Sequence, residues 1–181
     1  MRVLKITVSA AIGLLLLLLI ISFFLPSAWS VERSIIINAD ADIIFPYIDN
    51  LRRWPEWTVW YKDSENLVVT YEGPEEGIGA ISRWKDKNHD GLMKIVESQP
   101  NELVAYDLRF DKNASPMHGS IMLNSTIETT EIVWTATGDV GINPISKYFA
   151  LMLNSWMGED FERSLAKLKA ILENPTPKRT A

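Results

Sequence analysis

The sequence contains no cysteine. This absence excludes disulfide bonds and thiolate metal sites, although it does not exclude a location outside the cytoplasm. Histidine is scarce as well, since His89 and His118 are the only two, and they are not spaced as a pair of metal ligands on a helix. The chain also lacks a Gly-x-Ser-x-Gly motif and a glycine-rich phosphate loop. We therefore identify no catalytic residue, no metal site and no cofactor from the sequence.

Basic residues are outnumbered by acidic residues after the first 30 positions. Residues 31–181 carry 16 basic and 23 acidic side chains, which gives them a net charge of −7. Nucleic acids and anionic membrane surfaces both attract basic proteins. The composition therefore argues against either as a partner of the folded part of the chain.

The first 30 residues predict a membrane anchor. Residues 7–25 carry no charge and include six consecutive leucines, and as a helix they would span about 28 Å, close to the thickness of a bilayer core. Arg2 and Lys5 precede this run, so the positive-inside rule keeps the N-terminus in the cytoplasm. We expect a single pass through the inner (plasma) membrane, with the remainder of the chain in the periplasm or outside the cell.

A cleaved signal peptide is the competing interpretation of the same residues. Ala28 and Ser30 are small enough to precede a cleavage site. We favour an uncleaved anchor because the apolar run is longer than the core of most signal peptides. A buried core helix is disfavoured, because the six leucines leave the run without a polar face.

The middle of the chain predicts an antiparallel sheet of about six to seven strands. Alternating and β-branched residues, separated by Gly, Pro, Asn and Asp, indicate strands at 31–38, 67–71, 78–84, 92–98, 103–110, 119–126 and 130–137. The connections between the later strands are short, as antiparallel neighbours require. A short helical segment at 43–51 follows the first strand, and Trp54, Trp57 and Trp60 come after it. Their spacing of three favours a turn of core aromatics, with ligand contact as the alternative.

The C-terminal part predicts one long helix over residues 144–173. Asn143 followed by Pro144 is typical of a helix start, and Pro175 and Pro177 end the pattern. Large apolar residues recur at spacings of three and four and predict a single wide stripe that faces the sheet: Ile145, Phe149, Met152, Trp156, Met157, Phe161, Leu165, Leu168 and Leu172. We therefore expect an α+β domain in which a curved sheet wraps around this helix.

Where the sheet curls away from the helix, the gap would form an apolar pocket. We expect five residues to line it: Trp84, Tyr106, Trp134, Met152 and Trp156. Alternation along 103–110 places Val104, Tyr106, Leu108 and Phe110 on the inner face, so Asp107 and Arg109 should face solvent. Both histidines fall next to turn residues, and we expect them in exposed loops.

Five stretches of the sequence, taken together, are similar to one known superfamily. They are residues 50–60, 77–84, 91–97, 106–110 and 158–169. On these stretches residues 31–173 resemble the START-related SRPBCC superfamily, in its polyketide cyclase/dehydrase-like branch. The resemblance implies a helix-grip fold, a hydrophobic cavity between the sheet and the last helix, and small apolar or amphipathic ligands such as lipids, sterols or polyketides. None of the stretches is a catalytic signature.

The sequence leaves three functions open. The first, which we favour, is a membrane-anchored and exported protein that binds a hydrophobic, lipid-like molecule. The second is an enzyme of cyclase, dehydrase or hydrolase type acting in the same cavity, and the third is a protein-binding scaffold of the cell envelope. We expect residues 1–30 to form the anchor, 31–173 the START-like domain and 174–181 a flexible tail. The sequence does not indicate the oligomeric state.

Overall fold

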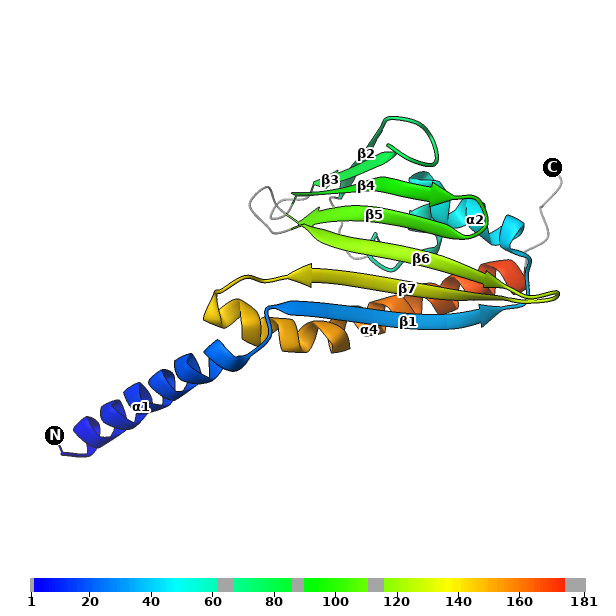
Figure 1. Cartoon of the computed structure of the whole chain (residues 1–181). Helices are drawn as coiled ribbons and strands as arrows, with labels where there is room; N and C mark the ends of the chain where they lie inside the picture. The colour runs from blue at the N-terminus through cyan, green and yellow to red at the C-terminus, as the bar shows by residue number, and fades with distance from the viewer. Residues whose placement is uncertain (1, 62–66, 86–89, 111–115, 175–181) are drawn as a thin grey trace.

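The structure, a computed structural model, describes residues 2–61, 67–85, 90–110 and 116–174. His89 and the expected tail beyond residue 174 lie outside this part of the chain. Seven antiparallel strands form one sheet in the order β1-β7-β6-β5-β4-β3-β2. The sheet curves around the long C-terminal helix (Figure 1), so the expected α+β helix-grip architecture is confirmed. The strands are β1 (Ala28–Ile37), β2 (Val68–Glu72), β3 (Ile81–Lys85), β4 (Asp90–Gln99), β5 (Leu103–Phe110), β6 (Met117–Ser125) and β7 (Thr130–Asp139).

Alternation along the strands determines which side chains face the helix. In β5, Val104, Tyr106 and Leu108 are buried, whereas Asp107 lies on the outer face, as predicted. A bulge between Ile95 and Glu97 shifts the register of β4 against β5, and bulges of this kind bend a sheet. The sheet therefore presents one apolar concave face and one polar outer face.

The long helix α4 (Pro144–Glu173) crosses the concave face. Asn143 caps the start of the helix as predicted, because its side chain accepts hydrogen bonds from the backbone N–H groups of Ile145 and Ser146. The second half packs into the core through Phe161, Leu165 and Leu168. The prediction of one continuous buried stripe is wrong for the first half, where several large apolar side chains are exposed: Ile145, Phe149, Leu151, Met152 and Trp156.

Three short helical segments close one end of the sheet: α2 (Ala41–Asp49), the 3-10 helix η1 (Leu51–Arg53) and α3 (Trp54–Trp57). They carry Trp54 and Trp57 into the interior, and both side chains are fully buried. The indole N–H of Trp54 donates to the Ile48 carbonyl, and that of Trp57 donates to the Tyr47 carbonyl. The prediction of a turn of core aromatics therefore holds for Trp54 and Trp57, whereas Trp60 lies beyond the end of α3 and is only partly buried.

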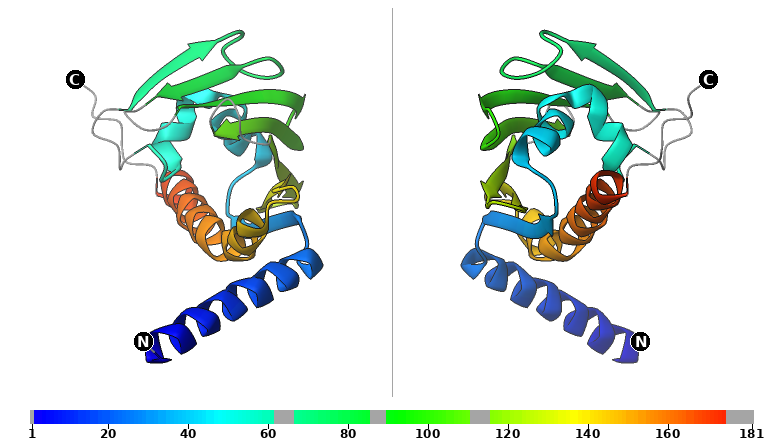
Figure 2. Two further views of the ribbon diagram at one scale, coloured as in Figure 1. Left: turned by 90° about the vertical axis from the view of Figure 1, so that its left-hand side faces the viewer. Right: turned by 90° about the vertical axis from the view of Figure 1, so that its right-hand side faces the viewer.

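The N-terminal helix α1 (Arg2–Phe24) projects from the domain (Figure 2). It is long and apolar enough to cross a membrane, and its residues are almost all exposed. It fits either an anchor or a signal sequence by length and composition. Strand β1 begins at Ala28, so three residues that we assigned to the anchor segment belong to the sheet.

Candidate functional site

Aromatic side chains fill the centre of the space between the sheet and α4. The rings of Trp134 from β7 and Phe161 from α4 are stacked, with centroids 4.0 Å apart and planes at 2°. The indole N–H of Trp134 donates to the hydroxyl oxygen of Tyr106 at 2.8 Å. Trp54 meets the Tyr106 ring edge-on at a centroid distance of 5.3 Å. These aromatic side chains pack directly against one another in the interior.

A cavity of about 530 Å³ lies beside this aromatic cluster, between the sheet and the first half of α4. We call it the sheet–helix cavity. Its volume falls within the usual range for small-molecule sites, roughly 300–1,000 Å³. Ten of its lining residues are apolar: Trp29, Trp60, Leu108, Phe110, Pro116, Met117, Val140, Phe149, Leu153 and Met157. The three polar ones are Asp139, Ser146 and Asp160.

Strand alternation and helical spacing bring these side chains together. Leu108 lies two residues beyond Tyr106 on the inner face of β5, and Met117 opposes it in the register of β6. On α4, Phe149, Leu153 and Met157 recur every four residues and therefore share one face. The flexible, polarizable methionines suit a pocket that adapts to apolar ligands of varied shape.

Each of the two carboxylates that line the cavity already accepts hydrogen bonds from the protein. Asp139 accepts from the Ser27 hydroxyl at 3.1 Å and from the backbone N–H of Gly141 at 2.6 Å. Asp160 accepts from the guanidinium of Arg163. These groups can orient the polar end of an amphipathic ligand, while the rest of the wall offers apolar contact.

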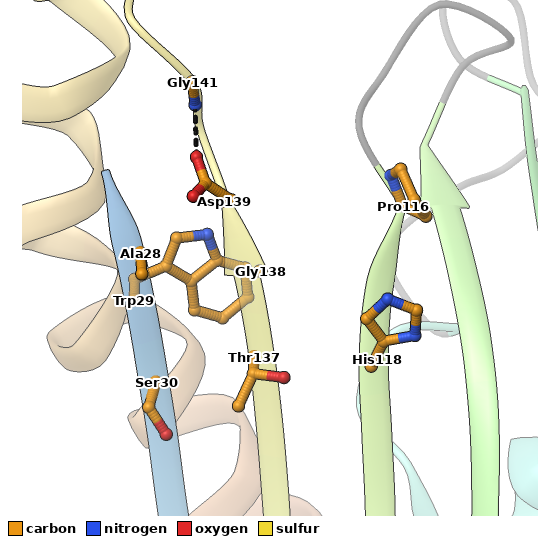
Figure 3. Close-up of a pocket in the computed structure, with 9 residues that line it drawn as sticks. All are labelled: Ala28, Trp29, Ser30, Pro116, His118, Thr137, Gly138, Asp139 and Gly141. Atoms are coloured by element: carbon orange, nitrogen blue, oxygen red, sulfur yellow. Dashed lines mark hydrogen bonds between the residues drawn. The ribbon is translucent and has the colours of Figure 1, made fainter. Parts of the chain in front are cut away.

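A second depression, of about 750 Å³, lies at the same end of the sheet, where β1 and β6 begin and β7 ends (Figure 3). The depression adjoins the sheet–helix cavity, because Trp29, Pro116 and Asp139 line both. The Trp29 indole lies against Gly138, where a Cβ atom would come within 2.7 Å of the ring. The depression is the more polar of the two, since Ser30, His118 and Thr137 contribute to its lining.

The five residues predicted to line the pocket do not line the sheet–helix cavity. Tyr106 and Trp134 are buried in the aromatic cluster, and Trp84 lies behind Phe110, with ring centroids 5.7 Å apart. Met152 and Trp156 are about half exposed on the outside of α4. Tyr106 and Trp134 were expected at the pocket because the sequence did not show that the aromatic side chains pack against one another there.

The histidine prediction is wrong for His118, which lies in β6 and not in a loop. Its side chain is exposed, as expected, and its Nδ1 lies 2.7 Å from the Asp107 carboxylate on the outer face of the sheet. No group of three or more His, Asp or Glu side chains that could hold a metal ion is found within the described ranges.

Burial raises the pKa of several tyrosines, most strongly those of Tyr106 and Tyr61. Tyr106 is completely enclosed, which raises the pKa of its phenol well above the ordinary value, although the hydrogen bond from Trp134 partly offsets the shift. Burial likewise raises the pKa of Tyr61 to about 12. Both phenols therefore stay protonated at neutral pH, where they act as hydrogen-bonding groups and not as bases.

Four of the residues that line the cavity were not predicted from the sequence to do so: Trp29, Leu108, Met117 and Leu153. Trp29 was overlooked because residues 28–30 were assigned to the anchor segment, although they begin β1. The helical spacing could have identified Leu153, because it lies four residues from both Phe149 and Met157 and therefore on the same face of the helix. Leu108 was placed correctly on the inner face of β5, but the sequence did not show where along the strand the cavity would open.

The fold agrees with comparisons to known proteins. A family model described as "Polyketide cyclase / dehydrase and lipid transport" matches residues 28–173. No curated protein sequence matches the chain significantly.

Several solved structures share the fold at low sequence identity. A protein from Thermobifida fusca has a TM-score of 0.63 at 18% identity, over 80% of this chain and 95% of that chain. A protein from Chromobacterium violaceum has a TM-score of 0.55 at 16% identity, over 80% and 96%. CalU16 from Micromonospora echinospora has a TM-score of 0.54 at 11% identity, over 81% and 76%. At these identities the structures show a common fold alone, whereas the family model covers most of the chain. The chain therefore belongs to the polyketide cyclase/dehydrase and lipid transport family, within the START-related superfamily that its sequence resembles.

Proposed function

We propose that the protein is a membrane-anchored, exported binding protein for a hydrophobic or amphipathic small molecule of the lipid type. The observation that carries this proposal is the sheet–helix cavity, which has ten apolar lining residues and a few polar groups. This composition is typical of sites that hold a ligand by burying apolar surface and orient it through a small number of polar contacts. The family description, which includes lipid transport, supports the same ligand class.

The position of the cavity supports a ligand that comes from a membrane. The cavity is lined by the first half of α4, and that half of the helix contacts the end of α1 through Lys147 and Tyr148. A cavity beside a membrane anchor can exchange an apolar molecule with the bilayer over a short path. We place the anchor in α1, with the N-terminus in the cytoplasm and the START-like domain outside it, because Arg2 and Lys5 precede the apolar run.

Native mass spectrometry of the full chain, purified from a lipid-containing host, tests the proposal. Three proteins are compared: the wild type, Leu153→Trp and Ala166→Trp. Leu153 lines the cavity, so a tryptophan there would occupy it, whereas Ala166 is exposed on the second half of α4 and provides a control of equal bulk. Lipids held against α1 should be common to all three proteins.

We expect a retained mass in the lipid range for the wild type and for Ala166→Trp, and its loss from Leu153→Trp. Circular dichroism should show that all three proteins are folded. Identical adduct distributions in the three proteins would contradict binding in the cavity. That result would favour an enzyme with a weakly held substrate or a protein-binding scaffold.

A further inference from the structure

The two halves of α4 differ sharply in charge. Residues 144–158 contain a single charged side chain, Lys147, whereas residues 159–173 contain seven. The exposed apolar residues follow the same division. The structure describes α4 over its whole length, and within it large apolar side chains are exposed only in the first half. The second half is thus an ordinary amphipathic helix, and the first half presents apolar surface to its surroundings.

Four exposed side chains form a continuous stripe on the first half: Ile145, Phe149, Met152 and Trp156. Their spacings of four, three and four residues place them on one face of the helix. Ile145 is 80% exposed, and the other three are about half exposed. Phe149 and Trp156 meet edge-on within the stripe, with centroids 5.3 Å apart. We call these four residues the α4 stripe. The exposed Ile142, just before the helix, adds to the apolar surface at this end.

The same half of α4 is joined to the candidate membrane span. The Tyr148 hydroxyl donates to the carbonyl oxygen of Leu18 at 2.7 Å, and Lys147 Nζ donates to that of Ser22 at 3.2 Å. The Lys147 contact puts a positive charge near the C-terminal end of α1, where the helix dipole favours it. Figures 1 and 2 both show the first half of α4 next to the end of α1, and the far end of α4 on the other side of the domain.

These contacts set the depth of α4 relative to the span. Leu18 lies six residues before Phe24, the last residue of α1, which corresponds to about 9 Å along the helix axis. If the apolar helix lies in a bilayer, Tyr148 reaches the level of its outer boundary or below it. Interfacial helices bury their apolar face by roughly 5–10 Å at this boundary, where Tyr and Trp are enriched. The α4 stripe matches this depth and composition.

We propose that the α4 stripe docks into the interface of the bilayer that holds α1. The inference rests on the part of the proposed function that places α1 in a membrane. Apolar burial must drive the docking, because the folded part of the chain is acidic and has no excess of positive charge to attract anionic lipid. Phe149 belongs to the stripe and also lines the sheet–helix cavity. The docked stripe would therefore lie at the rim of the cavity and give an apolar ligand a route from the bilayer.

Site-directed spin labelling of the full chain in phosphatidylcholine vesicles tests the docking. The chain has no cysteine, so single-cysteine variants need no other change. A nitroxide is attached at Ile145→Cys, Met152→Cys or Trp156→Cys, all on exposed positions. Ala166→Cys, exposed on the charged half of α4, is the control for an aqueous position, and Leu16→Cys in α1 is the control for the bilayer. The accessibility of each label to oxygen and to a water-soluble nickel complex is measured.

We expect the stripe labels to lose accessibility to the nickel complex and gain accessibility to oxygen relative to position 166. A lipid-exposed label at position 16 together with water-exposed stripe labels would overturn the docking and leave the anchor in place. Water exposure at both positions would overturn the docking and the anchor together. Protection from both reagents, with dipolar broadening between labels on different molecules, would show that a second copy of the chain covers the stripe and would also overturn the proposal. Ligand binding is read separately, by the mass measurement with Leu153→Trp.

Discussion

Arg33 packs against Gly158 on α4. We therefore expect Gly158→Ala to destabilise the protein when Arg33 is present and to stabilise it when Arg33 is replaced by alanine. Arg33 from β1 reaches α4, where its Nε donates to Glu162 at 2.5 Å and its Nη1 to the Asn154 side chain at 3.1 Å. A third bond joins its Nη2 to the Asn154 carbonyl oxygen at 3.2 Å. The guanidinium therefore lies directly against Gly158, and a Cβ atom at that position would overlap it.

The expected free energies follow from two opposing effects. Replacing glycine by alanine within a helix stabilises it by about 1 kcal/mol. Displacing the guanidinium from Gly158 breaks its three hydrogen bonds to α4, which are worth roughly 0.5–1.5 kcal/mol each, and the lower part of that range applies because the Glu162 side chain is 61% exposed. Gly158→Ala alone should therefore lower the free energy of unfolding by about 1 kcal/mol. In an Arg33→Ala background the obstacle is gone, and Gly158→Ala should raise it by up to about 1 kcal/mol.

Urea unfolding of the full chain in a mild detergent, followed by tryptophan fluorescence, measures all four proteins of this double-mutant cycle. The coupling between the two sites, about 2 kcal/mol, is the quantity of interest. A change in stability of the same amount and sign for Gly158→Ala in both backgrounds would contradict this prediction. In that case Arg33 would not be held over the glycine, and the bonds to Glu162 and Asn154 would not position α4 on the edge of the sheet.

Three further predictions concern the core, the start of α4 and the response to pH. Tyr106→Phe should cost about 1–3 kcal/mol in urea unfolding, because it leaves the buried indole N–H of Trp134 without its acceptor; an unchanged midpoint would argue against that hydrogen bond. Asn143→Ala should lower stability by about 1 kcal/mol through loss of the helix cap, and Asn143→Asp should restore most of it; equal stability of the two variants would count against the cap. The pKa of Tyr61 is raised to about 12 in the folded protein, so its contribution to stability is fully present below pH 10 and is lost as the pH rises through 12. Over this range the free energy of unfolding should fall less steeply with pH in Tyr61→Phe than in the wild type, by up to about 1.4 kcal/mol per pH unit. Parallel pH profiles for the two proteins would contradict the burial of this phenol.

Short-range patterns in the sequence predicted most of the fold. The alternation in β5 gave the correct inner face, because a strand with one buried side repeats every two residues. Asn143 and Pro144 marked the start of α4, because the capping bonds involve only neighbouring residues. Features of this kind depend on local geometry and are readable before any tertiary structure is known.

The site itself was not predictable to the same degree. The first half of α4 carries two neighbouring apolar faces, one lining the cavity through Leu153 and Met157 and one exposed through Met152 and Trp156. Helical spacing merges the two faces into one wide stripe, and the sequence does not say what covers each part. The packing of Trp134 against Phe161 is equally hidden, since these residues are 27 positions apart and meet only in the folded domain.

We propose that an apolar ligand enters the sheet–helix cavity from the bilayer. The most direct test uses a phospholipid with a photoactivatable diazirine in one acyl chain, incorporated into vesicles with the full chain and mapped by peptide mass spectrometry after irradiation. We predict adducts on Met117 of β6 and Met157 of α4, which both line the cavity, and their selective loss in Leu153→Trp. Adducts confined to α1 and the α4 stripe, with both methionines unlabelled, would contradict the account.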